Sequence, residues 1–159
     1  MRRIEISGML YRSYQPDDFD QLYAVEEICF RPPFRFSRVY MRQIVSSTDA
    51  ATWIAEEGGT IAGFAIVEWL VESNDATAYI QTIEVLPEFR RVGVAAELMR
   101  RLEASAIEAG ARFIWLHVDA ENSTAQRLYE RHGYTRQGRE ENYYPRGRAA
   151  LIYVKPLAI

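Results

Sequence analysis

The chain is poor in the residues that build disulfides and metal sites. Among its 159 residues are one cysteine, Cys29, and two histidines, His117 and His132. A single cysteine excludes an internal disulfide and fits a protein kept in a reducing compartment. Two histidines without clustered cysteines or carboxylates lack the spacing of a zinc site. We therefore expect no bound metal, and we expect a cytoplasmic location.

Long apolar runs and an excess of positive charge are also missing. No stretch approaches the roughly 20 apolar residues that a membrane-spanning helix needs, and residues 1–8 contain no apolar run typical of a signal peptide. The formal net charge is −3, whereas a nucleic-acid-binding domain usually carries a basic surplus. From these absences we expect that the protein binds neither a membrane nor a nucleic acid.

The composition that remains is typical of one globular domain. Hydrophobic residues make up 48% of the chain and charged residues 26%, which is ordinary for a folded protein with a real core. No linker, internal repeat or low-complexity segment interrupts the chain. We predict a single domain over residues 1–159, with a folded core over about 9–157.

Hydrophobic periodicity predicts a sequence of alternating strands and helices. We expect strands at 9–14, 52–56, 60–69, 76–85, 113–118, 134–141 and 148–154, and helices at 15–30, 38–47, 94–109 and from about 122. Gly58-Gly59 is typical of a hairpin turn, and Gly110 of a helix end. The order β-α-α-β-β-β-α-β-α-β-β predicts an α/β (α+β) fold, with a mixed sheet of six or seven strands and helices on both faces.

The segment 83–96 carries the most information about function. It reads as a short strand, a turn with the pattern Arg-x-x-Gly-x-Ala, and the start of a helix. A glycine followed by small residues lets the main chain approach a bulky ligand closely. The first N–H groups of a helix are unpaired, and its dipole is positive at that end, so phosphate oxygens bind well there. The segment matches neither of the two common phosphate loops.

A second motif gives this turn its context. After an apolar strand at 113–118, residues 122–134 read Asn-x-x-Ala-x-x-x-Tyr-x-x-x-Gly-Tyr. Together the two motifs resemble the GCN5-related N-acetyltransferases (GNAT family) over roughly 9–157. The Leu-His-Val of the strand and the tail at 141–145 look most like the protein N-terminal acetyltransferases, including the ribosomal-protein alanine type. The resemblance implies a GNAT fold and direct transfer of an acetyl group to an amine.

The resemblance also implies acetyl-CoA as co-substrate, bound largely by the main chain. Its pyrophosphate is expected on the N–H groups of 91–96, and its pantetheine arm along 83–85 in the manner of an added strand. That pairing requires the strand before the turn to splay from the next strand, and it turns the Val85 N–H toward the thioester oxygen. The implied cofactor-binding residues are Ile83, Glu84, Val85, Arg90, Arg91, Val92, Gly93, Val94, Ala95, Ala96, Asn122 and Tyr129.

Tyr129 is the candidate proton donor to the departing thiolate, because it occupies the family's Leu-Tyr-Glu position. A phenol stays protonated at neutral pH and can donate a hydrogen bond. The alternative is that Tyr129 lies on the apolar face of an amphipathic helix and only packs in the protein core. Asn122 is expected to contact the pantetheine arm and also suits a helix cap. Ser123-x-x-Gln126 reads as a capping box, which leaves the start of the helix open.

The general base is where the chain departs from the N-terminal acetyltransferases that it resembles. They have Leu-Glu-Val, whereas here the central residue is His117. An imidazole, with an ordinary pKa of about 6.5, suits an α-ammonium of about 7.7–8.0 better than a lysine ammonium of about 10.4. His117 could instead only pack beside Trp115 and Phe113. Glu84, acting through water, and Tyr79, at the position of a base in other family members, are the other candidates.

The acceptor side of the site combines matching and altered features. Tyr143 and Tyr144 match the tyrosine pair that grips a peptide N-terminus, and the segment from Phe30 to Phe34 is expected to form the opposite wall. The acidic stretch usual after that pair is replaced by Pro-Arg-Gly-Arg-Ala at 145–149. Arginines there favour an acceptor with a carboxylate or phosphate, unless they only form a solvated hairpin tip.

Three functions therefore stay open at this point. We expect acetylation of a protein or peptide N-terminal α-amine by a monomer or homodimer. A small-molecule amine is the alternative acceptor. A domain that binds acyl-CoA without catalysis is the third possibility, because the usual glutamate is replaced by His117.

Overall fold

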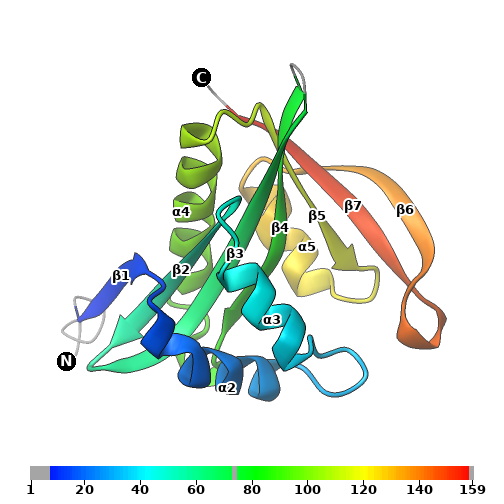
Figure 1. The fold of residues 1–159 in the computed structure, drawn as a ribbon. Helices are drawn as coiled ribbons and strands as arrows, with labels where there is room; N and C mark the ends of the chain where they lie inside the picture. The colour runs from blue at the N-terminus through cyan, green and yellow to red at the C-terminus, as the bar shows by residue number, and fades with distance from the viewer. Residues whose placement is uncertain (1–7, 73–74, 158–159) are drawn as a thin grey trace.

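A seven-stranded mixed sheet forms the centre of the fold (Figure 1). The computed structural model describes residues 8–72 and 75–157. The strands are β1 (Met9–Ser13), β2 (Ala50–Glu57), β3 (Thr60–Glu72), β4 (Asp75–Val85), β5 (Phe113–Asp119), β6 (Thr135–Tyr144) and β7 (Arg148–Pro156). They lie in the order β1-β2-β3-β4-β5-β7-β6. Strands β4 and β5 run parallel, and the other neighbours are antiparallel.

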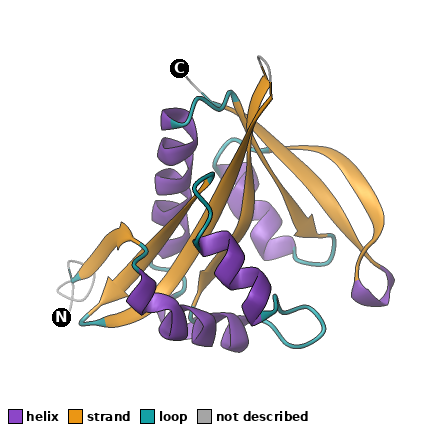
Figure 2. Cartoon of the chain, viewed as in Figure 1, coloured by secondary structure: helices purple, strands orange, loops and turns teal. Residues whose placement is uncertain are grey.

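Helices cover both faces of this sheet (Figure 2). They are α2 (Phe19–Cys29), α3 (Arg38–Val45), α4 (Val94–Glu108) and α5 (Ser123–Arg131), with short 3-10 turns at Pro16–Asp18, Pro87–Phe89 and Pro145–Gly147. Helices α2 and α3 pack on one face around Leu22, Met41 and Phe64. Helices α4 and α5 pack on the other face, where Leu98 and Tyr129 belong to the larger core cluster. None of the described helices is long and apolar enough to cross a membrane.

The predicted order of elements is confirmed, and two local predictions are corrected. The helix expected over 15–30 begins with a 3-10 turn, because Pro16 provides no N–H and the Asp18 carboxylate accepts a hydrogen bond from the Gln15 N–H at 2.7 Å. The capping box predicted from Ser123 and Gln126 is wrong. Asn122 is the N-cap, and the Gln126 amide instead donates to the main-chain oxygen of Asp119.

Strand β4 determines where a ligand can enter the sheet. It pairs with β3 along its whole length, but it pairs with β5 only at 77–79. Figure 1 shows the two strands together at one end and well separated at the other. The predicted splay is therefore present, and no strand within residues 8–72 and 75–157 pairs with the β4 edge from Ile80 to Val85. On the other side β3 and β4 are very close, because a Cβ on Gly63 would lie 2.5 Å from the Glu84 oxygen.

Candidate active site

The free edge of β4 presents main-chain groups of Val85 to the space between the strands. The Leu86 N–H donates to the Ala62 oxygen of β3 at 2.8 Å. Main-chain groups of successive strand residues point to opposite sides, so the Val85 N–H faces away from β3. The Val85 oxygen accepts a hydrogen bond from the Arg90 guanidinium at 2.7 Å. This edge has the free donor that a strand-like ligand needs.

The turn after β4 leaves the start of α4 open. Gly93 is the N-cap of α4, with a left-handed φ of 90°, and Arg91 is left-handed at 68°. The first main-chain bond within the helix joins the Glu97 N–H to the Gly93 oxygen at 3.1 Å, so the N–H groups of 94–96 have no partner in the helix. A Cβ on Gly93 would meet nothing within 4 Å. The open, positively polarised helix end fits a diphosphate.

Tyr129 approaches the same space from α5. The residue is only 9% exposed and packs in one core cluster with Val85. Its ring meets the ring of Tyr134 edge-on, with centroids 5.6 Å apart. Burial raises the pKa of Tyr129 to about 12, so the phenol keeps its proton at neutral pH. Its hydroxyl bonds to no residue in the described part of the chain, which leaves the proton free to donate.

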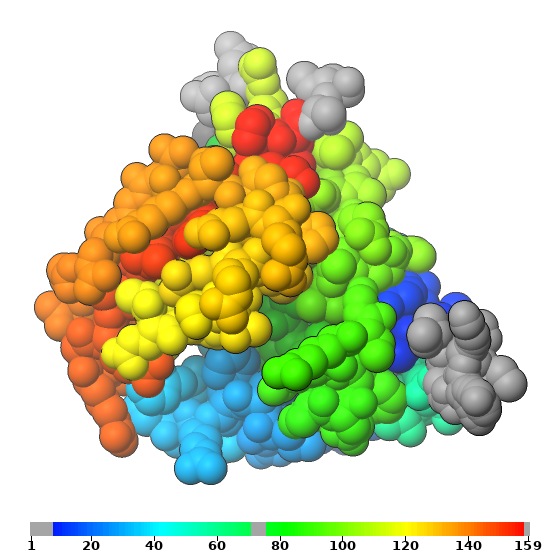
Figure 3. Space-filling model, turned by 180° about the vertical axis from the view of Figure 1, so that it is seen from behind, coloured from blue at the N-terminus to red at the C-terminus, as the bar shows by residue number. Residues whose placement is uncertain are grey.

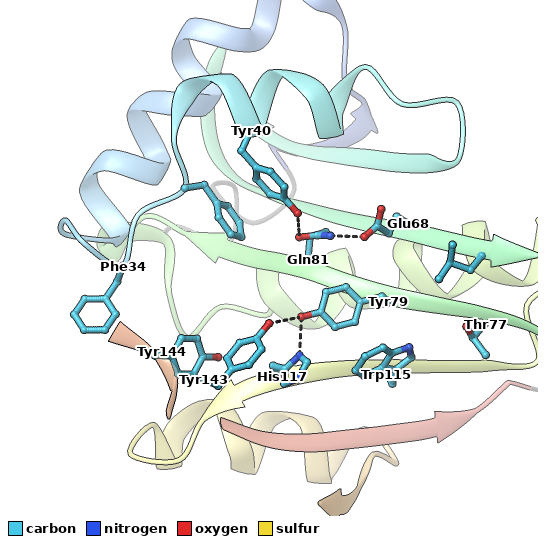
Figure 4. A pocket seen from close by; sticks show the side chains of 12 residues that line it. Phe34, Tyr40, Glu68, Thr77, Tyr79, Gln81, Trp115, His117, Tyr143 and Tyr144 are labelled. Atoms are coloured by element: carbon cyan, nitrogen blue, oxygen red, sulfur yellow. Dashed lines mark hydrogen bonds between the residues drawn. The ribbon is translucent and has the colours of Figure 1, made fainter. Parts of the chain in front are cut away.

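A cleft of about 540 Å³ lies on the opposite face of the sheet, below α2 and α3 (Figure 4). Most of its walls are aromatic, with three polar side chains, those of Glu68, Thr77 and Gln81, from β3 and β4. It is lined by Phe34, Phe36, Tyr40, Glu68, Leu70, Thr77, Tyr79, Gln81, Trp115, His117, Tyr143 and Tyr144. The other face of the sheet, where α4 and α5 lie, is turned toward the viewer in Figure 3, and its surface is hollowed between the green of residues near 90, the yellow near 120 and the blue near 30.

The cleft brings together four residues that the sequence predicted separately. The Tyr79 hydroxyl lies 2.8 Å from His117 Nδ1 and 3.4 Å from the Tyr143 hydroxyl. The Tyr143 ring stacks on the His117 ring with centroids 3.9 Å apart, and Tyr144 meets Tyr143 edge-on at 4.9 Å. Burial, with a further effect of Tyr143, raises the pKa of Tyr79 well above its ordinary value. Two of the candidate bases are therefore one hydrogen-bonded pair.

Other predicted site residues lie elsewhere. Of the segment predicted to form the wall, Phe34 lines the cleft together with Phe36, whereas Phe30 does not line it. The cap expected of Asn122 is confirmed, because its side-chain oxygen accepts from the Ala125 N–H at 3.1 Å, and its contact with the pantetheine arm stays a prediction. Arg148 does not belong to a solvated tip, because it is half-buried, pairs with Asp119 and lies over the Phe34 ring.

Glu84 carries its carboxyl into the protein rather than into the cleft. It is 2% exposed and faces Glu26 of α2, which is 1% exposed. The Glu84 Oε2 accepts from the Thr82 hydroxyl at 2.8 Å, and the Glu26 Oε2 accepts from the Phe36 N–H at 2.9 Å. The Oε1 atom of each glutamate has no partner among the described residues. One proton shared by the two carboxyls would satisfy both atoms. Burial, followed by the contact with Glu26, raises the pKa of Glu84.

Replacing this carboxyl, as in Glu84→Gln, is expected to flatten the dependence of stability on pH. Below the ordinary glutamate pKa of about 4.3, Glu84 is protonated in both the folded and the unfolded state. As pH rises from there through the raised folded-state pKa of Glu84, only the unfolded chain loses the proton, so the stability of the wild type falls. Urea unfolding between pH 5 and 9 measures the slope. Glu27→Gln, at the exposed surface of α2, is the control. Equal slopes for both variants and the wild type would contradict the shared proton.

Sequence reasoning missed Glu26 and Glu140. Glu140 of β6 lies 3.0 Å from His117 Nε2, and neither residue belongs to a motif. Both contacts join segments far apart in the chain, which periodicity within one element cannot reveal. Among residues 8–72 and 75–157 no cluster of three or more histidine, cysteine, aspartate or glutamate side chains is arranged to hold a metal ion.

Comparison with known proteins agrees with this geometry. The model of the acetyltransferase (GNAT) family matches residues 12–134. A ribosomal protein bS18-alanine N-acetyltransferase of Escherichia coli (strain K12) is 33% identical over 106 residues, which are 65% of this chain and 69% of the relative. The catalytic subunit NAA10 of the N-terminal acetyltransferase A complex of Arabidopsis thaliana is 29% identical over 144 residues, 89% of this chain and 74% of that one.

Solved structures are similar over nearly the full chain. The ribosomal-protein-S18-alanine N-acetyltransferase from Escherichia coli superposes with a TM-score of 0.83 at 25% identity and covers 95% of both chains. Arabidopsis thaliana NAA60 in complex with acetyl-CoA gives a TM-score of 0.84 at 21% identity, over 93% of this chain and 98% of that one. At 21% identity, the similarity to NAA60 shows that the two chains share a fold.

Proposed function

The chain belongs to the acetyltransferase (GNAT) family, and from this membership we propose that it acetylates the α-amine of a protein or peptide N-terminus with acetyl-CoA. The observation that carries the proposal is a pair of sites on opposite faces of the sheet. Tyr129 and the free β4 edge lie on one side, and the Tyr79–His117 pair with two further tyrosines lies on the other. The names of relatives that acetylate bS18 alanine support the acceptor. We also propose one domain and a cytoplasmic location.

Main-chain groups would hold and polarise the co-substrate. The N–H groups at the start of α4 would bind its diphosphate, with Arg90 fixing the turn to the Val85 oxygen. The free edge of β4 would pair with the pantetheine arm, as an added strand does. The co-substrate supplies a thioester carbonyl, and the Val85 N–H would donate to its oxygen as negative charge develops there.

Side chains would then handle two protons. Before attack the acceptor ammonium must lose a proton, and the Tyr79–His117 pair is positioned to take it. Tyr129 would donate to the departing thiolate, because its hydroxyl keeps its proton and has no partner in the described part of the chain. Holding amine and thioester in line supplies the largest share of the rate, roughly 7–11 kcal/mol in well-oriented reactions.

Two features favour a peptide N-terminus over an anionic small molecule. Tyr143 and Tyr144 narrow the cleft beside His117 and offer hydroxyls for a peptide main chain. The nearby Arg148 is already paired with Asp119, and a second carboxylate, that of Glu121, lies 3.8 Å away. An acceptor carboxylate would have to displace those partners.

The release of free thiol from acetyl-CoA tests the proposal. We expect turnover with peptides that have a free N-terminal amine and little turnover with the same peptides after chemical blocking of that amine. Internal lysine peptides and small amines form the comparison set. If only small amines are acetylated, the acceptor is a small-molecule amine and not a peptide N-terminus. Binding of acetyl-CoA without turnover on any amine would identify a non-catalytic acyl-CoA-binding domain.

A further inference from the structure

Both ring nitrogens of His117 have a partner, and the two partners come from different strands. Nδ1 lies 2.8 Å from the Tyr79 hydroxyl of β4, and Nε2 lies 3.0 Å from Glu140 Oε1 of β6. We propose that Glu140 is a positioning residue that holds the proton of His117 on Nε2, so that His117 takes the acceptor's proton only through Tyr79. This inference rests on the proposed function.

The assignment of the proton follows from what each partner can do. An exposed carboxylate only accepts hydrogen bonds, and Glu140 is 52% exposed. Nε2 must therefore carry the hydrogen that Glu140 accepts, which leaves a lone pair on Nδ1 of the neutral ring. That lone pair accepts from the Tyr79 hydroxyl. The opposite tautomer would set the Nε2 lone pair against a negative charge.

This arrangement makes Tyr79 the group that touches the substrate. Since Nδ1 is occupied, the ammonium of the acceptor reaches the pair at the Tyr79 oxygen. One N–H bond of the ammonium breaks and its proton binds that oxygen, while the Tyr79 O–H bond breaks and its proton moves to Nδ1. The products are a neutral amine, an intact phenol and an imidazolium next to the Glu140 carboxylate. The number of protons and the total charge are unchanged.

The surroundings leave Glu140 as the group that compensates the imidazolium. Beside it, the His117 ring is packed by Tyr79 of β4, Trp115 of β5 and Tyr143 of β6. None of these three is a carboxylate. His117 itself is 9% exposed, so water replaces the missing charge poorly. Solvent around Glu140 screens the attraction between its carboxylate and the His117 imidazolium, so the contribution of Glu140 to the rate is moderate.

Two variants at position 140 separate the effect of the hydrogen bond to Nε2–H, which sets the tautomer of His117, from the effect of the negative charge. In Glu140→Gln the amide oxygen still accepts from Nε2–H, but the negative charge is gone, whereas Glu140→Ala removes both. Glu141→Gln is the matched control, because this exposed neighbour on β6 pairs with Arg139 instead. We expect kcat on an α-amine peptide to fall about threefold in the Gln variant and about tenfold in the Ala variant. Both losses are smaller than the roughly 10²–10⁴-fold that general acid–base catalysis typically contributes. The acid limb of the kcat profile should move to lower pH, while KM for acetyl-CoA stays constant.

Nitrogen NMR of the imidazole provides a readout that does not depend on activity. In the His132→Asn background the remaining ring signal belongs to His117. We expect the Nε2–H tautomer in the parent and in Glu140→Gln, and a mixture in Glu140→Ala. An Nδ1–H tautomer in the parent, or pH–rate profiles that match those of Glu141→Gln, would overturn the proposal. Absence of turnover on every α-amine peptide, with the predicted tautomer present, would instead reject the proposed function and leave the assignment of the proton standing.

Discussion

Replacing Tyr129 with phenylalanine is expected to lower kcat about 100-fold and to leave the affinity for acetyl-CoA nearly unchanged. The change removes one hydroxyl, whose contribution as a general acid is typically worth 10²–10⁴-fold. The ring stays, so its packing against Tyr134 and Tyr153 is retained. Single-turnover kinetics with a peptide acceptor and calorimetry with acetyl-CoA measure the two effects separately.

The neighbouring tyrosine provides the control for this result. Tyr134 is also buried in the same cluster, but its hydroxyl donates to Glu103 at 2.7 Å, away from the strand edge. Tyr134→Phe should cost stability, about 1 kcal/mol for one hydrogen bond, with kcat close to that of the wild type. If both variants lose turnover equally, or if neither does, Tyr129 is a core residue and another group protonates the thiolate.

The features that could be predicted from the sequence are local in the chain. The turn at Gly93 and the unpaired start of α4 are encoded within a few residues, as is the end of that helix at Gly110. The register of β4 placed Tyr79 on the face where the cleft lies, and that of β5 placed His117 and Trp115 there. The splay of β4 from β5 was expected from the family resemblance, and the strand pairing confirms it.

The features that could not be predicted depend on pairings between distant segments. Glu140 of β6 contacts His117 of β5 across β7, and the β6–β7 register shifts before and after Glu140. The Glu26–Glu84 pair joins α2 to β4 across the sheet face. Arg148 looked like part of a hairpin tip, yet the carboxylate of Asp119 at the end of β5 binds it. Propensity and periodicity describe one element at a time, so they contain none of these contacts.

Removing the main-chain N–H of Val85 is expected to lower kcat about 10²–10³-fold, because one donor to a developing oxyanion is typically worth about 2.7–4 kcal/mol. Semisynthesis with the α-hydroxy acid analogue of valine replaces the amide by an ester and keeps the side chain. Since the Val85 N–H faces the free edge of β4, the ester deletes no bond to β3, and the unfolding free energy should change little.

The same replacement at Leu86 gives the opposite expectation. Its N–H donates to the Ala62 oxygen at 2.8 Å, so an ester there removes a bond within the sheet, worth about 0.5–1.5 kcal/mol of stability, and leaves the donor at Val85 in place. Turnover should then stay within a few-fold of the wild type after correction for the folded fraction. Two esters one residue apart therefore separate catalysis from stability. Equal kcat values for both would mean that Val85 donates to no reacting oxygen and that binding along β4 serves only to align the thioester.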